Sequence, residues 1–402
     1  MIARLSSTFL MVLLLAFTLP ALVDAEGRWQ KSGSLRSLNL SSDSYPGDLA
    51  PSFNLSSTYL RLESLWDSGS HWQIEAVSDY QLLGTDPDGI VPLPKDGVNR
   101  HFDLDHSWHH QSGWDSRLQI DRINATWTGR KADLTLGRQA VGFGRIAIFS
   151  PLDIIAPFAP DALDTDFRPG VDALRLNTYY SLDGQLGAMA VLGDVDRHNS
   201  YLVTWVDNWA GIDLLAIGGS LRKRPMIGFG GAGDLGPLGL KAEMAIYEGE
   251  RVDQPGGDLH EHMVISAVEL WYRFDNGLTL ITEYLHNGAG ENDPAKYSQV
   301  LFSAPYEEGL TSLLGRHYLL TTTNYELHPL VALNGLLIWN IQDDSWLLRP
   351  TLDVSLADSV SLELFWTYPE GDSPKKRFFF PEARSEFGSY GQSGGLFVKW
   401  FF

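Results

Sequence analysis

Residues 138–175 interleave arginines with aspartates among apolar residues. The charged members are Arg138, Arg145, Asp153, Asp161, Asp164, Asp166, Arg168, Asp172 and Arg175. Opposed charges of this kind can form ion pairs that fix a segment in place. Where some of them stay unpaired, they can instead set an electric field that acts on a passing solute. The sequence leaves both interpretations open, and the chemistry on offer is electrostatic rather than covalent.

Motifs for catalysis, metal binding or nucleic-acid binding are weak. Residues 391–395 read GQSGG and match a nucleophile elbow, but they lie at the start of an expected strand and not at a strand-to-helix turn. The histidines of HSWHH (106–110) and HEH (260–262) fall in or beside expected loops, where histidine is common. No basic run accompanies the net charge of −20. We therefore predict no enzymatic activity, no cofactor, no metal site and no nucleic-acid partner.

The beginning of the sequence predicts export. A positive charge at Arg4 precedes an apolar run, and residues 23–25 (VDA) offer small side chains for cleavage. We interpret residues 1–25 as a signal peptide and residues 26–402 as the mature protein. A membrane-anchoring helix is the alternative, which the shortness of the apolar run disfavours. Since the chain has no Cys, disulfides and thiolate metal sites are excluded.

The mature chain alternates apolar and polar residues with a period of two. In residues 71–83, even positions are mostly apolar and odd positions mostly polar, and the pattern recurs in several later segments. A soluble sandwich would also alternate, but here the polar faces carry many charges, as in the lumen of a membrane barrel. The charged residues that this parity places in the lumen are Arg61, Glu63, Glu75, Asp79, Lys241, Glu243, Glu269, Arg273, Glu283, Arg349, Asp353 and Glu363.

The connections between these segments are alternately short and long. Short turn signals such as 236–239 and 275–277 alternate with long stretches such as 84–114 and 287–315. This indicates an all-β protein, a transmembrane antiparallel up-and-down β-barrel of about 18 strands, with 16 possible. The apolar parity switches within residues 117–127, which predicts a β-bulge.

The stretch from 140 to 171 is expected to fold into the barrel. Phe149, Ile154, Ile155 and Phe158 are too apolar for a solvated outer loop, and prolines exclude a long helix or a central strand. An inward course would cover these side chains. Whether such a loop closes the lumen or only narrows it stays open.

The last residues predict a lipid-facing strand. Leu396, Val398, Trp400 and Phe402 share one parity, so we expect them to contact lipid and the aromatic membrane interface. A terminal Phe after alternating apolar residues resembles the signal that the barrel-assembly machinery recognises. That machinery, outer-membrane lipid and lipopolysaccharide are the predicted partners, together with small hydrophilic solutes.

Two stretches carry a resemblance to a known family. The motifs LGRQAVGFGR, FSPLDI and FRPG, and later GRHYLLTTTNYELHPLVAL and SWLLRP, resemble proteobacterial outer-membrane porins, akin to substrate-specific porins and alginate-export barrels. The resemblance implies a monomeric barrel with an inward-folded loop, and it implies that Arg138, Arg145, Arg168 and Arg175 line the passage. The predicted lumen holds eight acids against four bases, which argues against an alginate-like pathway.

These observations predict an outer-membrane channel for passive diffusion of small hydrophilic solutes, with a weak preference for cations. The alternatives are a dedicated exporter or importer of a polysaccharide, carboxylates or a hydrophobic compound, and an outer-membrane hydrolase. In each case the chain would be exported through the periplasm to the outer membrane.

Overall fold

The computed structural model describes residues 27–87, 98–109, 113–252, 254–375 and 381–402. The predicted signal peptide lies outside the described residues. Strands β1 to β10 are β1 (Arg28–Ser42), β2 (Phe53–Asp67), β3 (Trp72–Asp86), β4 (Asp105–His109), β5 (Trp114–Thr128), β6 (Ala132–Ala140), β7 (Gly170–Tyr179), β8 (Gln185–Leu192), β9 (Ser200–Trp209) and β10 (Ile212–Leu221). Strands β11 to β19 are β11 (Arg224–Leu235), β12 (Leu238–Glu248), β13 (His262–Arg273), β14 (Thr279–Asn287), β15 (His317–His328), β16 (Val331–Asn340), β17 (Ser345–Ala357), β18 (Val360–Glu370) and β19 (Ser393–Phe401).

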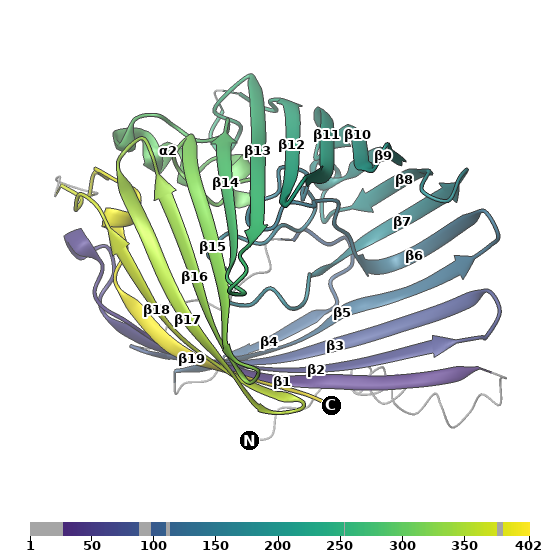
Figure 1. Ribbon diagram of the computed structural model, residues 1–402, viewed down its shortest axis with the longest axis horizontal. Helices are drawn as coiled ribbons and strands as arrows, with labels where there is room; N and C mark the ends of the chain where they lie inside the picture. Colours follow the sequence, from purple (N-terminus) through teal and green to yellow (C-terminus); the bar gives the residue numbers. More distant parts are fainter. Residues whose placement is uncertain (1–26, 88–97, 110–112, 253, 376–380) are drawn as a thin grey trace.

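All neighbouring strands pair antiparallel, and the ring closes where β19 pairs with β1 (Figure 1). Strand β4 is a short addition that pairs only with β5, so the closed barrel has eighteen strands. This confirms the predicted fold class and strand number. Closure matters because it pairs the first and last strands, which would otherwise be sheet edges facing lipid.

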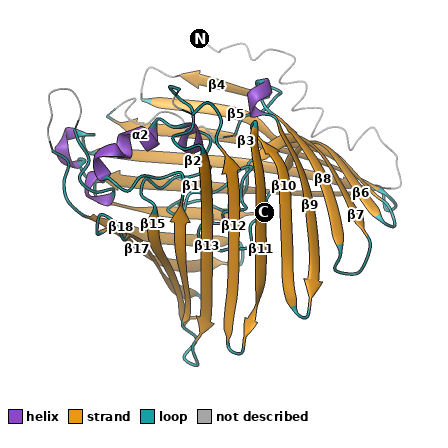
Figure 2. Ribbon diagram, turned by 90° about the horizontal axis from the view of Figure 1, so that it is seen from above, coloured by secondary structure: helices purple, strands orange, loops and turns teal. Residues whose placement is uncertain are grey.

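Among the described residues, helical structure is confined to connections. The helices are α2 (Tyr297–Leu301) and α3 (Ala304–Glu307), with 3₁₀ turns η2 (Pro46–Asp48), η3 (Asp196–His198), η4 (Pro294–Lys296) and η5 (Phe387–Ser389). Figure 2 shows the helices gathered at one end of the barrel, called here the long-loop end, and the tight turns that join β9 to β10 and β11 to β12 at the other. Within the described ranges, no helix is long and apolar enough to cross a membrane.

The predicted parity describes the outer surface well. Trp72, Ile74 and Tyr80 of β3 are exposed, as are Val268 and Leu270 of β13. Because exposed apolar side chains recur around the ring, the barrel presents the outward apolar face that a bilayer requires.

The last strand follows the same rule. Leu396, Trp400 and Phe402 are exposed, while Phe397 and Lys399 between them are buried. Phe402 also closes the ring, since its backbone N–H donates to Gly33 O at 2.9 Å and its C=O accepts from Gly33 N at 2.8 Å.

The predicted bulge is present in β5. Val77 of β3 pairs with Arg122, whereas the next residue, Ser78, pairs with Ile120, so Asp121 has no partner across the ladder. The extra residue explains why the apolar parity switches at this point of the sequence. It also turns a carboxylate toward the interior, where Asp121 is only 2% exposed.

Candidate functional site

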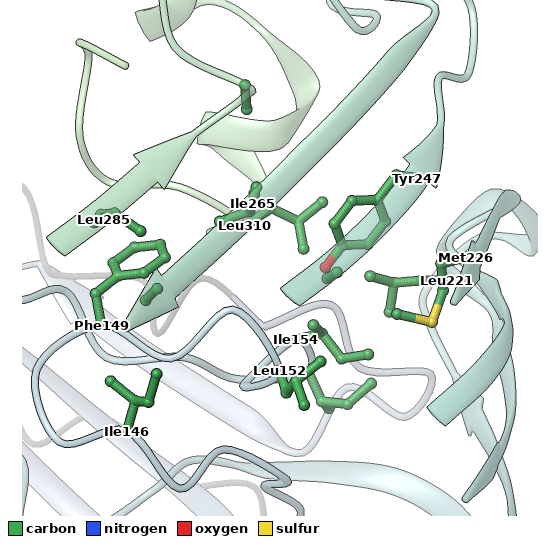
Figure 3. Close-up of a cluster of buried hydrophobic side chains, with 14 of the residues drawn as sticks. Ile146, Phe149, Leu152, Ile154, Leu221, Met226, Tyr247, Ile265, Leu285 and Leu310 are labelled. Atoms are coloured by element: carbon green, nitrogen blue, oxygen red, sulfur yellow. The ribbon is translucent and has the colours of Figure 1, made fainter. Parts of the chain in front are cut away.

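The connection between β6 and β7, residues 141–169, folds into the barrel and is called here the inner loop. Its first half packs Ile146, Phe149, Leu152 and Ile154 against the inner wall, as Figure 3 shows. The wall side chains in this cluster include Leu221, Met226, Tyr247, Ile265 and Leu285. This burial confirms the predicted inward course, and it fills the lumen beside β10 to β14.

Three wall carboxylates hold the backbone of this half. Glu243 of β12 accepts hydrogen bonds from the amides of Arg145 (2.6 Å), Ile146 (3.2 Å) and Leu152 (3.3 Å), and also from the Ser150 hydroxyl. Glu269 and Glu283 each accept a hydrogen bond from one further backbone amide of the inner loop.

Glu269 of β13 accepts from Ala147 N at 2.5 Å, and Glu283 of β14 accepts from Phe149 N at 3.2 Å. The two carboxylates lie directly opposite each other across the β13–β14 ladder, and Lys241 pairs with Glu269 at 2.8 Å. All three glutamates are buried. They therefore satisfy loop amides that would otherwise be buried without partners.

Glycine in β11 makes room for the inner loop. A Cβ at Gly228 would lie 2.5 Å from Leu152 Cδ2, and one at Gly230 would lie 3.0 Å from Leu152 Cδ1. Strand β11 keeps a regular register with both neighbours. The glycine-rich segment is therefore a site of close approach rather than a bulge or a phosphate cradle.

The second half of the inner loop contacts the opposite wall. Asp164 pairs with Arg36 of β1, and Asp166 pairs with Lys399 of β19 at 3.0 Å. Arg349 of β17 donates to the Asp161 carbonyl at 2.7 Å. Since its first half is fixed to β10–β14, the loop is pinned at both sides of the lumen.

A buried ionic cluster stands behind this second attachment. Arg61 of β2, only 1% exposed, contacts Asp79 at 2.8 Å, Asp121 at 3.0 Å and Glu63 at 2.6 Å. The Phe167 ring of the inner loop lies 4.4 Å from the Arg61 guanidinium, and the Arg36 guanidinium lies 4.6 Å from the same ring. The loop is thus seated by cation–π contacts as well as ion pairs.

Strand β5 pairs with β6 only from Ile123 to Thr128, so the part of β5 before Ile123, nearer the long-loop end, is separated from β6. Residues 98–105 and β4 lie in the gap, and Arg138 holds them there. Arg138 donates to the Phe102 carbonyl at 2.5 Å and to Asp172 at 2.8 Å, and it is 2% exposed. Arg100 closes the same region by donating to Gly170 O at 2.8 Å.

A cavity of about 590 Å³ lies between the inner loop and the wall of β14–β19 and is called here the loop–wall cavity. The wall contributes mostly uncharged polar residues, namely Thr279, Thr322, Thr323, Asn324, Asn334 and Thr351, together with Ile281, Gly335 and Leu336. The loop contributes mainly apolar ones, namely Ala147, Ile148, Phe158, Ala159, Pro160, Ala162 and Leu163. One corner is charged, with Asp166, Arg349, Asp353, Glu363 and Lys399. The inner loop therefore narrows the lumen and leaves this space beside it.

The predicted constriction residues divide into several groups. Asp166 lines the cavity, and Asp164 anchors the loop. Arg168 donates to Asp153 at 2.6 Å inside the loop. Burial raises the pKa of the Asp153 carboxyl above its ordinary value, although the contact with Arg168 opposes this shift. The remaining members, Arg138, Arg145, Asp172 and Arg175, are absent from the cavity lining.

Of these four, Arg138 and Asp172 pair in the wall. Arg145 reaches within 4.0 Å of Asp213, and Arg175 is half-buried in β7. Their role in lining a passage, which the resemblance implied, stays a prediction.

The predicted lumen residues are also divided. Arg349, Asp353 and Glu363 line the loop–wall cavity. Those that hold the inner loop or pair beside it are Lys241, Glu243, Glu269 and Glu283. Arg61, Glu63 and Asp79 belong to the ionic cluster, Glu75 pairs with Arg122 at 3.1 Å, and Arg273 is exposed near the short turn after β13.

Sequence reasoning missed four residues of this site. Arg36 and Phe167 seat the loop, Asp121 neutralises Arg61, and Lys399 joins Asp166 to Glu363. The lumen position of Lys399 could have been predicted from the sequence, because Lys399 has the opposite parity to Val398 and Trp400, which were predicted to face lipid. Asp121 could also have been inferred from the parity switch once the bulge was placed.

Among the described residues, no group of three or more His, Asp or Glu side chains is arranged to hold a metal ion. Ser393 of the GQSGG motif opens strand β19 and pairs with Ser42. Its strand position lacks the strand-to-helix turn of a nucleophile elbow.

No protein-family model and no curated protein matches the sequence. Among solved structures, OccAB4 of Acinetobacter baumannii has 8% identity and a TM-score of 0.57, with 94% of this chain and 98% of that chain covered. A BenF-like porin from Pseudomonas fluorescens has 8% identity and a TM-score of 0.57 over 93% and 98%. OccD3 (OpdP) of Pseudomonas aeruginosa has 11% identity and a TM-score of 0.53 over 92% and 91%. The chain therefore has the fold of the proteobacterial outer-membrane porins.

Proposed function

We propose that this chain is an outer-membrane channel through which small hydrophilic solutes diffuse passively. One observation carries the proposal: a closed barrel with an apolar exterior holds an inner loop that leaves the polar loop–wall cavity of about 590 Å³ open beside it. Such a barrel provides a polar route across the bilayer without further machinery. The long-loop end would face outward, as in bacterial barrels.

This route is supported by the fact that other parts of the inner wall are covered by chain segments. The β10–β14 wall is covered by the first half of the inner loop, and the upper β5–β7 wall is covered by residues 98–105. The wall of β14–β17 keeps polar residues open to the loop–wall cavity. Solutes would therefore pass between this wall and the loop.

The proposed cation preference rests on the charges that line the loop–wall cavity, and not on all the charges of the barrel wall. Glu243, Glu269 and Glu283 are buried beneath the inner loop and do not line the cavity, so a solute in the cavity does not contact them. The cavity lining holds three carboxylates (Asp166, Asp353, Glu363) and two cations (Arg349, Lys399), a net charge of −1. Because wall charges lie within about 8 Å of a passing ion, the Debye length at physiological salt, this charge would favour cations weakly.

Asp353→Asn is expected to remove most of this preference, because it brings the cavity charge from −1 to zero with little change in shape. Asp353 hydrogen-bonds to Asn334, and no described cation pairs with it, so the substitution breaks no ion pair. The measurement is the reversal potential of the purified protein in a planar bilayer under a salt gradient. Asp234→Asn, near the end of β11 and outside the cavity lining, serves as the control. Anion selectivity in the wild type, or an unchanged potential in the variant, would contradict the proposed preference.

The assembly route is part of the same proposal. The exposed Leu396, Trp400 and Phe402 on β19 support recognition of this strand by the barrel-assembly machinery and contact with outer-membrane lipid and lipopolysaccharide. Export through the periplasm would precede this step.

A further inference from the structure

The loop–wall cavity has two chemically different faces. On the wall, Thr322 of β15 and Thr351 of β17 present hydroxyls that form no side-chain hydrogen bond with any other described residue. Beside them, Asn324 Nδ2 donates to Asn334 Oδ1 at 2.6 Å, which leaves the Asn324 carbonyl oxygen available as an acceptor. This face can exchange hydrogen bonds with water or with a solute, because it offers both donors and acceptors.

The opposite face is formed by the inner loop and is mostly apolar. Ile148, Phe158, Pro160 and Leu163 line it, and all are partly exposed. The Phe158 ring is fixed by the Arg168 guanidinium, 5.1 Å from its centroid, and Arg168 is itself held by Asp153 and by the Ala156 carbonyl. An apolar surface that is kept in place in this way can contact the non-polar face of a solute without reorganisation.

Three of the five charges at the corner of the cavity pair with one another. Lys399 contacts Glu363 at 2.6 Å and Asp166 at 3.0 Å, whereas Arg349 donates to neutral oxygens, Thr367 Oγ1 at 2.9 Å and the Asp161 carbonyl. A carboxylate solute would have to displace Glu363 or Asp166 to pair with Lys399. The two carboxylates on Lys399 and the net charge of −1 argue against anionic substrates.

From this arrangement we infer that the loop–wall cavity is a binding site for uncharged polyhydroxyl solutes, such as monosaccharides. A pyranose ring has an apolar face and a rim of hydroxyls, which match the loop face and the threonine–asparagine face respectively. The volume of about 590 Å³ lies within the range of about 300–1,000 Å³ that small-molecule sites occupy. This inference rests on the proposed function and names the solute class of the same site.

The test uses the full-length protein in liposomes and measures uptake of labelled glucose and gluconate, which differ in charge at similar size. A gluconate carboxylate that finds no partner in the cavity leaves at least one polar contact unsatisfied, which is worth about fivefold. We therefore expect glucose to enter faster than gluconate by about fivefold or more. Thr322→Val with Thr351→Val removes both hydroxyls and should lower glucose uptake by about tenfold, while ionic conductance changes by less than twofold.

The matched control is Thr321→Val, which changes the neighbouring residue on the outer face of β15, opposite Leu337. It should leave glucose uptake unchanged. Faster entry of gluconate than of glucose, or equal glucose uptake by the double variant and the control, would overturn the inference while ionic conductance still supported a channel. Absence of both conductance and uptake would overturn the channel proposal together with it.

Discussion

Replacement of Arg61 by methionine is expected to lower the stability of the barrel by about 3–5 kcal/mol, the cost of leaving buried charges without their partner. Asp79 would then lose the cation that it pairs with, while Asp121 would keep Arg100 at 3.3 Å, and the Phe167 ring would lose one of its two guanidinium neighbours. The measurement is the midpoint of thermal unfolding of the purified barrel in detergent, followed by its band shift on electrophoresis.

Two further variants separate the charge effect from lost packing. Neutralising Asp79 as well, by Arg61→Met with Asp79→Asn, should restore most of the lost stability, because Asp121 keeps Arg100 as its partner. Arg384→Met is the matched control, since Arg384 is 44% exposed and pairs with Asp372 at 2.5 Å outside the cluster, and we expect it to cost no more than about 1 kcal/mol. An Arg61→Met barrel as stable as the wild type would show that the cluster does not hold the structure.

Substitution of Glu243 by alanine is expected to free the first half of the inner loop. Glu243 accepts hydrogen bonds from three backbone amides and from Ser150, and bonds to a charged acceptor are worth about 1.5–3 kcal/mol each. A loss of about 3 kcal/mol would raise the ratio of undocked to docked loop by a factor of about 100. Single-channel recordings should then show a larger and noisier current than in the wild type.

Glu63→Ala provides the control for this effect. Glu63 is also a lumen carboxylate, but it pairs with Arg61 and has no hydrogen bond to the inner loop among the described residues. Its removal should alter selectivity slightly and leave the current steady. If Glu243→Ala gave the same current and noise as the wild type, the carboxylates would not be what fixes the loop.

The architecture could be predicted from the sequence because a membrane barrel imposes a local rule. Side chains on each strand alternate between lipid and lumen, so the even-numbered apolar residues of 71–83 predicted the exposed Trp72, Ile74 and Tyr80. Short turns predicted one end, long connections predicted the other, and the parity switch predicted the bulge at Asp121. Each of these signals lies within a few neighbouring residues.

The candidate site could be predicted only in part, because its contacts join distant segments. Parity placed Glu243 in the lumen, but nothing local shows that the amides of Arg145 and Ile146, about a hundred residues earlier, take up its oxygens. Likewise, Arg138 and Asp172 belong to the charged segment of the sequence, yet they pair in the wall where β5 and β6 separate. Counting lumen charges therefore overstated the acidity that a solute meets.

The central claim is that solutes pass between the inner loop and the wall of β14–β17, and single-channel current from a protein with one introduced thiol tests it most directly. The natural sequence has no Cys, so Thr351→Cys places one reactive group in the loop–wall cavity, and Thr321→Cys places one on the lipid-facing side of β15 as the control. A bulky, water-soluble thiol reagent should reduce the current of the position-351 variant by at least half and leave the control unchanged. An unchanged current, with complete modification of position 351 verified by mass, would show that the passage lies elsewhere.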